Sequence, residues 1–364
     1  MRTRSRIVLA AAAGLSLAVT TGAGGASASA PSSALHGLRV IKTLSSSYAG
    51  PLQFAIHGRT VLVADSFTAT LNRIGSSTPL ATGPDAGSGG DIAGVDFTSS
   101  AIAYTSSSAD HSVTTLTILR KGHKTVVADL AGFEKKRNPD GAIHYGVSDP
   151  ATVTQACSDE LAKAEVPVSY SGQVDSHPYA VAALGNGAWA VADAGGNDLL
   201  KVDSRGRVSV ISVLPAQRVT ISAASATANG IPDCGGVTYA FESVPTDVEV
   251  ASHGGLWATT LPGGPEGPDS GNPGSLYRID RHGHPSRVAT GFASATNLAV
   301  DSRGRVFVAE LGSGTIAVVG HGAGRTVATL PGVVGVEWSS GHLYASTAPG
   351  ATGGDGPGTI VELG

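Results

Sequence analysis

Residues 178–215 read PYAVAALGNGAWAVADAGGNDLLKVDSRGRVSVISVLP, and residues 295–331 return to the same pattern as ATNLAVDSRGRVFVAELGSGTIAVVGHGAGRTVATLP. Self-similarity at a period of about 40 residues is typical of repeat folds. Each copy holds four short apolar runs separated by Gly, Asp, Ser or Asn, which is the pattern of strands joined by tight turns. Four antiparallel strands per repeat predict one blade of a β-propeller.

Six such units can be laid along the chain. Besides the two quoted copies, units begin near Pro51, Gly94, Pro245 and Gly335. The last unit lacks a fourth strand, whereas the run LRVIKTL at Leu38–Leu44 precedes the first unit without partners. Pairing this run with the last unit removes the edges that an open sheet would expose. The sequence therefore predicts an all-β, six-bladed β-propeller whose sixth blade is completed by residues 38–44.

The N-terminal residues 1–30 have the three parts of a secretory signal peptide. MRTRSR is followed by the apolar run IVLAAAAGLSLAVTT and by a small-residue cleavage site at Ala28-Ser29-Ala30. An uncleaved membrane anchor is the alternative, but the run is short and rich in Ala and Gly. We therefore expect a freely secreted, extracellular protein in which residues 31–364 form one propeller domain.

Charge narrows the range of partners. Cleavage after residue 30 removes three Arg and no acidic residue, so the 24 basic residues fall to about 21 against 28 acidic ones, a formal net charge of about −7. This balance does not favour nucleic acid or an anionic membrane as a partner. A monomer that binds a small molecule, a glycan or an envelope component is expected.

Two non-repeating inserts, at about residues 138–176 and 218–243, flank the third unit on one face of the ring. They carry Cys157 and Cys234, the two cysteines of the chain. In an oxidising compartment a disulfide between them is the natural interpretation, and two unpaired thiols are the alternative. Ser148-Asp149-Pro150 can open a helix over Ala151–Ala164, which we expect to be the only helix and a cap over the propeller mouth.

Equivalent positions at the starts of the innermost strands border the central channel. The third position of the unit is occupied in turn by Gln53, Gly94, Ala180, Asp247, Asn297 and Gly335. Two residues later the series reads Ala55, Asp96, Ala182, Glu249, Ala299 and Glu337. Acid and alanine alternate in the second series, which predicts a set of acidic side chains along the channel.

Asp247, Glu249 and Asn297 are the candidate metal ligands. Asp247 and Asn297 belong to adjacent units and occupy the same level of the channel. Glu249 follows Asp247 by two residues, so it lies deeper in the channel on the same face of its strand. Carboxylate and amide oxygens are hard ligands suited to calcium. The alternative is structural, because the same groups can accept hydrogen bonds from neighbouring inner strands and hold the blades together. Polar contacts to a substrate are a third interpretation.

The segment LPGGPEGPDSGNPG, residues 261–274, interrupts the fourth unit on the same face as the inserts. It carries Glu266 and Asp269, which are candidate binding residues; a solvated loop is the alternative. His177, with Asp175 two residues before it, is the histidine that the repeat places near the channel mouth. A lone histidine is more often a structural or surface residue, so its role stays open.

Asp65, Asp193 and Glu310 recur at one position of the second strand. A carboxylate there can cap the following turn by bonding its backbone amides. Recurrence predicts a structural role, because an active site would be needed once. The chain contains no G-x-S-x-G, HExxH or CxxC pattern, so no catalytic residue is predicted.

Three stretches resemble the ScyD/ScyE family of secreted bacterial proteins. They are TYAFESVPTDVEVASHGGLWATTLPGGPEGP (238–268), SHPYAVAALGNGAWAVADAGGNDLLKVD (176–203) and IPDCGG (231–236). The resemblance covers almost the whole mature chain and implies a fold similar to NHL-repeat propellers, but no established activity. A looser similarity to six-bladed calcium-dependent lactonases implies a channel metal, with Asp247 and Asn297 as the matching ligands and Gln53 where those proteins carry an acid.

Two main functions are compatible with these observations. The first is a secreted, non-catalytic propeller that presents its insert-bearing face to a small molecule, a glycan or an envelope partner. The second is a calcium-dependent hydrolase or lactonase-like enzyme at the channel, with His177 as a candidate base. A structural envelope protein is a third hypothesis. Repeats specify a scaffold, and the function belongs to sites placed on it.

Overall fold

The computed structural model describes residues 37–252, 254–264, 273–320 and 324–364. Within these residues the strands form seven four-stranded sheets, in which paired strands run antiparallel. The expected signal peptide, residues 1–30, lies outside the described residues. Six of the sheets follow the repeat of the sequence, and the seventh is built from the two inserts.

Five of the six repeat sheets are consecutive in the chain. The first sheet contains β2 (Pro51–His57), β3 (Thr60–Asp65), β4 (Thr70–Arg73) and β5 (Ala81–Thr82), and the second contains β6 (Val95–Phe97), β7 (Ala101–Ser107), β8 (Thr114–Arg120) and β9 (Val126–Asp129). The third contains β12 (Pro178–Gly185), β13 (Ala188–Asp193), β14 (Asp198–Val202) and β15 (Val208–Val213), and the fourth contains β18 (Ser243–Val250), β19 (Leu256–Pro262), β20 (Gly274–Ile279) and β21 (Pro285–Phe292). The fifth contains β22 (Ala295–Val300), β23 (Val306–Glu310), β24 (Thr315–Val319) and β25 (Gly324–Thr329).

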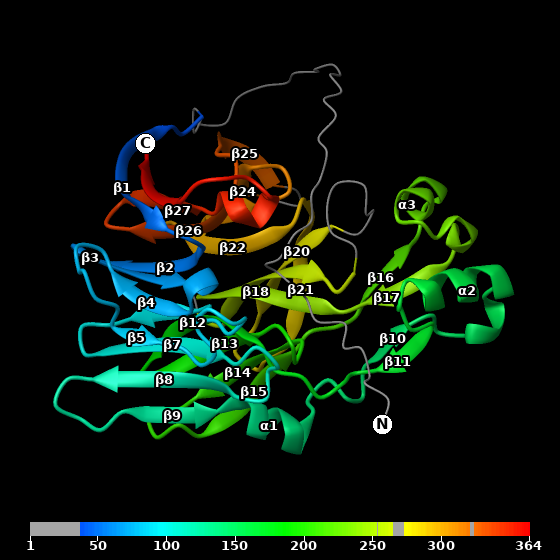
Figure 1. The fold of residues 1–364 in the computed structure, drawn as a ribbon, viewed down its shortest axis with the longest axis horizontal. Helices are drawn as coiled ribbons and strands as arrows, with labels where there is room; N and C mark the ends of the chain where they lie inside the picture. Colours follow the sequence, from blue (N-terminus) through cyan, green and yellow to red (C-terminus); the bar gives the residue numbers. More distant parts are fainter. Residues whose placement is uncertain (1–36, 253, 265–272, 321–323) are drawn as a thin grey trace.

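The sixth repeat sheet joins the two ends of the chain. It has the order β1-β28-β27-β26, with β26 (Val333–Ser339), β27 (His342–Thr347), β28 (Gly358–Leu363) and the N-terminal β1 (Val40–Tyr48). β1 runs antiparallel to β28, with Val40 opposite Leu363 and Thr43 opposite Val361. Figure 1 shows this blue N-terminal strand beside the red C-terminal one. The predicted pairing of the N-terminal strand with the last unit is confirmed.

The first strands of these six sheets contact one another in a closed cycle, β2-β6-β12-β18-β22-β26 and back to β2. Five of them start with the same irregularity in register, located between Pro51 and Gln53, Pro178 and Ala180, Pro245 and Asp247, Ala295 and Asn297, and Val333 and Gly335. The repeat alignment therefore matches equivalent backbone positions. The protein is a β-propeller.

Small apolar side chains form the core between neighbouring sheets. One cluster joins Ala180, Ala182 and Leu199 of one sheet to Val248 and Ala258 of the next, all at most 2% exposed. Alanine at the inner strands lets adjacent sheets approach closely near the axis, and larger residues fill the wider outer spaces.

The two inserts form a sheet of their own, which was not predicted. Its order is β11-β10-β17-β16, with β10 (His144–Gly146), β11 (Ser169–Ser171), β16 (Gln217–Thr220) and β17 (Thr238–Phe241). We call this the insert sheet. The predicted disulfide is confirmed, because Cys157 and Cys234 are bonded with an S–S distance of 2.05 Å. Figure 1 shows the insert sheet extending to one side of the propeller sheets rather than over them.

The prediction of a single helix is wrong. The described residues contain three α-helices, α1 (Leu130–Arg137), α2 (Gln155–Lys163) and α3 (Ala223–Ala228), and four short 3-10 helices, η1 (Ser66–Thr68), η2 (Pro150–Thr152), η3 (Pro232–Cys234) and η4 (Pro349–Thr352). The expected helix over Ala151–Ala164 is divided, because Thr154 breaks the run and caps α2 by accepting a hydrogen bond from the Cys157 amide. None of the described helices is long and apolar enough to span a membrane.

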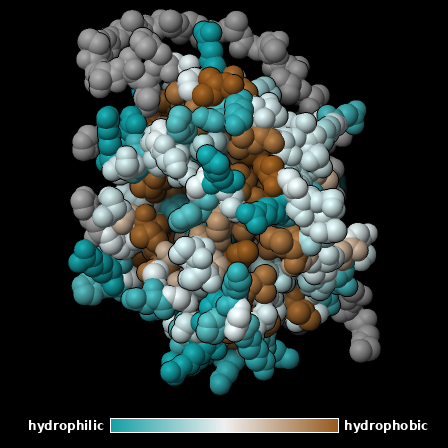
Figure 2. Space-filling model, turned by 90° about the vertical axis from the view of Figure 1, so that its left-hand side faces the viewer, coloured by the Kyte–Doolittle hydropathy of each residue, from teal (hydrophilic) through white to brown (hydrophobic). Residues whose placement is uncertain are grey.

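Viewed from the side opposite the insert sheet, the molecule shows a patchwork of polar and apolar surface (Figure 2). Scattered apolar side chains are usual on protein surfaces and do not by themselves indicate a binding site.

Candidate functional site

At the level of Gln53, side chains cross the channel and bond to one another. Asn297 Nδ2 donates to Gln53 Oε1 at 2.7 Å, and Gln53 Nε2 donates to the backbone oxygen of Thr246 at 3.2 Å. Asn297 Oδ1 in turn accepts from the Val336 amide at 2.6 Å. All three side chains, Gln53, Thr246 and Asn297, are at most 5% exposed. The polar groups of Gln53 and Asn297 therefore connect inner strands that are not neighbours in the sequence.

The carboxylates beside them bond to the next inner strand around the ring. Asp247 Oδ2 accepts a hydrogen bond from the Leu298 amide at 2.8 Å. Asp96 Oδ2 accepts one from the Ala183 amide at 2.7 Å. These are the contacts that the structural interpretation of the channel acids predicts, since each carboxylate joins two adjacent blades.

Burial and mutual repulsion dominate the electrostatics of the channel. Burial raises the pKa of Asp96 to about 6. The pKa values of Asp247, Glu249 and Glu337 are also raised, first by burial and then by the other carboxyls of the group. Four acids thus share one poorly hydrated space, and they disfavour each other's ionisation.

The predicted metal set of Asp247, Glu249 and Asn297 does not fit an ion well. Oδ1 of Asn297 and Oδ2 of Asp247 already accept backbone hydrogen bonds. Among the residues that the structure describes, no three His, Cys, Asp or Glu side chains are arranged to hold a metal. We derive no chemical step through a metal in the channel.

The recurrent second-strand acids bond to backbone amides, mainly at the entry to their own blade. Asp65 accepts from the Gly50 amide at 2.6 Å, and Glu310 accepts from the Ala293 amide at 2.9 Å. Asp193 accepts from the His177 amide at 2.6 Å and also from Gly195 in the following turn at 3.2 Å. These contacts are structural.

His177 lies in a compact pair of histidine–aspartate contacts. His177 Nε2 is 2.7 Å from Asp91 Oδ2, and His111 Nδ1 is 3.1 Å from Asp175 Oδ1. The two imidazole rings stack with their centroids 4.5 Å apart. Asp91 and the neighbouring carboxylates raise the pKa of His177 against the opposing effect of its burial. No described hydroxyl or thiol is bonded to either imidazole, so the cluster lacks the nucleophile of a hydrolytic triad.

The proposed loop acids, Glu266 and Asp269, lie outside the described residues.

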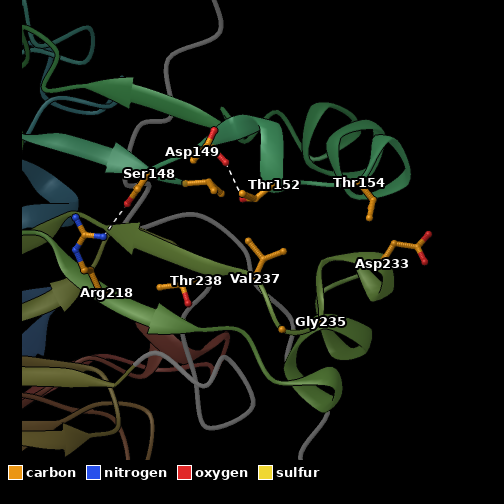
Figure 3. Close-up of a pocket in the computed structure, with 11 residues that line it drawn as sticks. Ser148, Asp149, Thr152, Thr154, Arg218, Asp233, Gly235, Val237 and Thr238 are labelled. Atoms are coloured by element: carbon orange, nitrogen blue, oxygen red, sulfur yellow. Dashed lines mark hydrogen bonds between the residues drawn. The ribbon is translucent and has the colours of Figure 1, made fainter.

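A pocket of about 560 Å³ opens in the insert sheet. Figure 3 shows its residues arriving from both inserts. The segment that follows β10 supplies one wall and the β16–β17 region with η3 supplies the other; the lining residues are Val147, Ser148, Asp149, Thr152, Thr154, Arg218, Asp233, Gly235, Gly236, Val237 and Thr238. A volume of this size suits a small organic ligand.

The polar groups of this pocket are held by local contacts. Arg218 Nη1 donates to Ser148 Oγ at 2.7 Å, which positions the guanidinium across the opening between β16 and the end of β10 (Figure 3). Asp149 Oδ1 accepts from the Ala151 amide at 3.1 Å, and the Asp233 amide donates to Glu160 Oε2 at 2.9 Å. Hydroxyls, the Asp149 carboxylate and one guanidinium therefore line a space with a small valine surface, whereas the Asp233 carboxylate points away from the other lining side chains (Figure 3).

Sequence reasoning missed this pocket. The signals that could have found it are the short runs QRVT at residues 217–220 and TYAF at residues 238–241, whose β-branched and aromatic residues are typical of strands. Together with the predicted disulfide, they indicate that the inserts pair with each other.

The comparisons with known proteins support the fold alone. No protein-family model matches the chain, and no curated protein matches it. The chain is similar in structure to a PQQ-bound aldose sugar dehydrogenase from Streptomyces coelicolor, at 16% identity and a TM-score of 0.53, over 90% of this chain and 97% of that one. It is also similar to a virginiamycin B lyase from Staphylococcus aureus (12% identity, TM-score 0.48, 86% and 82% covered) and a gluconolactonase from Xanthomonas campestris (14%, 0.43, 89% and 89%).

Proposed function

We propose that this protein is a secreted, non-catalytic binding propeller of the ScyD/ScyE type, and that it binds a saccharide in the pocket of the insert sheet. The observation that carries the proposal is the pocket itself. Its two walls come from separate inserts, which the Cys157–Cys234 disulfide ties together. The propeller would serve as the rigid support for this recognition surface.

The chemistry of the lining favours a ligand with many hydroxyl groups. The carboxylate of Asp149 can accept hydrogen bonds from sugar hydroxyls, while the side chains of Thr152 and Thr238 can donate or accept. Arg218 adds a fork of donors that suits a hydroxyl pair or the carboxylate of an acidic sugar. The alternating donors and acceptors of a saccharide complement this set better than an apolar ligand would.

The alternative, a calcium-dependent hydrolase at the channel, has weaker support. The Asn297 and Asp247 oxygens that would coordinate an ion are engaged in bonds between blades. The His177–Asp91 contact offers a base without an adjacent nucleophile. A lactone and ester panel, assayed with and without calcium, tests this alternative separately.

Ligand-observed NMR with a panel of neutral and acidic mono- and disaccharides tests the proposal. Arg218→Ala should weaken binding at least about tenfold, because a hydrogen bond to a charged group is worth roughly 1.5–3 kcal/mol. Asp149→Asn keeps an acceptor for the Ala151 amide but removes the charge, and it should weaken binding less.

Arg205→Ala is the matched control, since Arg205 is an exposed arginine in the turn between β14 and β15, outside the pocket lining. It should bind like the wild type. Equal binding by the Arg218 and Arg205 variants would contradict the pocket assignment. Failure of the whole panel, together with calcium-dependent hydrolysis of a lactone, would replace the proposal with the enzymatic alternative.

A further inference from the structure

Four carboxyl groups are buried together where the insert sheet meets the propeller. Glu134 lies on α1, Asp140 follows that helix, and Asp193 and Asp198 flank the turn between β13 and β14. The exposed fractions of these residues are 2%, 0%, 1% and 0%. None of the ion pairs recorded for the described residues includes any of the four.

Three of these carboxyls have oxygens without a hydrogen-bond partner. Both carboxylate oxygens of Asp198 are unpartnered, as are Oε1 of Glu134 and Oδ1 of Asp140. The amide oxygen of Asn197, a residue that is 2% exposed, is unpartnered as well. Asp193 differs from the others, because it accepts bonds from Ser176 Oγ and the His177 amide. Buried oxygens of this kind are rare in folded proteins and call for an explanation.

The side chains of Glu134 and Asp198 both lie beside Gly196. A Cβ atom placed on this glycine would lie 3.4 Å from Glu134 Oε2 and 3.5 Å from Asp198 Oδ1. Asp140 is joined to the same turn, since Asn197 Nδ2 donates to Asp140 Oδ2 at 3.0 Å. Side-chain oxygens of α1, of the first insert and of the turn itself therefore lie near the turn between β13 and β14.

Leaving these charges uncompensated would be costly. An isolated buried carboxylate is strongly destabilising unless it is paired, protonated or bound to a metal. The cluster requires one of these forms of compensation, and no described arginine or lysine provides it by an ion pair.

We propose that Glu134, Asp140 and Asp198 bind a calcium ion, with the side-chain oxygen of Asn197 as a further ligand. All the available donors are oxygens, which favours a hard cation over zinc or copper. Calcium accepts irregular geometry and a mixture of carboxylate and carbonyl ligands, whereas magnesium demands a near-octahedral arrangement. This site is distinct from the channel acids and goes beyond the proposed saccharide pocket.

The ligands are not arranged in advance around one point, as no group of three acidic side chains in the described part of the chain meets the geometry of a metal site. Binding would therefore draw the Glu134, Asp140 and Asp198 side chains together. We expect a modest affinity, of the kind found in weaker calcium modules rather than in rigid high-affinity sites.

Calcium at this position would tie the insert sheet to the third blade. Tyr145 of β10 donates its hydroxyl to Asp140 Oδ2 at 3.1 Å, and Asn197 bonds to the same oxygen. Tyr145 is also in ring contact with Tyr170 of β11, with centroids 5.4 Å apart. An ion held by Asp140 and Asp198 would consequently order the base of the insert sheet.

Chelator-treated full-length protein, titrated with calcium chloride, provides the test. Calcium should raise Tm by at least a few degrees, and terbium should bind competitively with luminescence sensitised by Tyr145. Asp198→Asn should weaken calcium binding at least tenfold, yet it should be no less stable than wild type without calcium because it removes a buried charge. Glu337→Gln, a neutralised acid in the channel, is the matched control and should keep the calcium response.

Three results would overturn the proposal. They are a wild-type Tm that does not respond to calcium, an equal response in Asp198→Asn, and loss of the response in Glu337→Gln, which would place the ion in the channel. If Asp198→Asn does not fold, hydrogen exchange of the wild-type protein with and without calcium replaces it as the test of the proposal. Calcium should then protect residues 130–145 and 195–200 selectively, and no difference in these segments would also overturn the proposal.

Discussion

Asn297 and Gln53 are 244 positions apart in the chain, yet Asn297 Nδ2 donates a hydrogen bond to Gln53 Oε1 at 2.7 Å. Asn297 Oδ1 accepts from the Val336 amide, so one buried side chain bonds to two other inner strands. Residues that the sequence suggested as ligands of a channel metal therefore act as connections between blades.

Replacing Asn297 with alanine should destabilise the propeller. The Val336 amide and Gln53 Oε1 would lose their partner in a buried setting, where each unsatisfied group costs roughly 1–3 kcal/mol. We expect Asn297→Ala to lower the free energy of unfolding by about 2–4 kcal/mol in chemical denaturation. The control is Asn72→Ala, since the recorded side-chain bonds of Asn72 reach only Thr70 within β4. A smaller loss for Asn297→Ala than for Asn72→Ala would refute the bridging role.

Asp96 should make the stability of the protein depend on pH between about 4 and 6. Its folded pKa, about 6, lies above the ordinary value for an aspartate, so the folded state binds a proton more tightly than the unfolded state. Stability therefore falls as pH rises through this window. The contribution is up to about 3 kcal/mol, at about 1.4 kcal/mol per unit of pKa shift.

Asp96→Asn removes this titration while leaving an acceptor for the Ala183 amide. Relative to wild type, the variant should gain stability as pH is raised from 4 to 8, measured by denaturant unfolding at each pH. A difference between the two proteins that stays constant over this range would contradict the assignment.

Loss of the disulfide should affect the insert sheet more than the propeller. The bond closes a loop with a sequence separation of 77, and removal of such a bond typically costs about 2–4 kcal/mol. The Cys157→Ser/Cys234→Ser variant should unfold at lower temperature and lose saccharide binding. Its Tm should not change on addition of reductant, whereas that of the wild type should fall. A wild-type Tm that is insensitive to complete reduction would count against this account.

Deletion of residues 38–44 should open the sixth sheet. β1 contributes exposed side chains, with Val40 and Ile41 at 47% and 58%, so its main effect is to cover the edge of β28. Exposed edges promote association between chains. Size-exclusion chromatography should show dimers or larger species for the deletion variant and a monomer for the chain that retains residues 38–44. A monomeric deletion variant of unchanged Tm would show that this closure is dispensable.

The repeat allowed much of the fold to be predicted. Gln53, Asp247 and Asn297 were aligned by pattern alone, and each follows the same register irregularity in its strand. The insert sheet could not be predicted from the repeat. Its strand β10 has only three residues, and its partner β17 is far away in sequence, with Gly146 opposite Ala240. Such pairing has no local periodicity.

The buried acids were missed for a different reason. Glu134 stands in the charged run FEKKR, and Asp198 follows the turn sequence GGN, so both look like surface residues in the sequence. Only the packing of α1 and the first insert against the third blade buries them. Tertiary contacts, rather than residue type, decide their environment.

Hydrogen exchange of the protein with and without a bound saccharide tests the central claim most directly, because it locates the binding site without a mutation. Our account predicts protection in residues 147–154 and 233–238, on the two walls of the pocket, with little change in the inner strands. Protection confined to the strands that carry Asp96, Asp247 and Asn297 would contradict it and place the ligand in the channel.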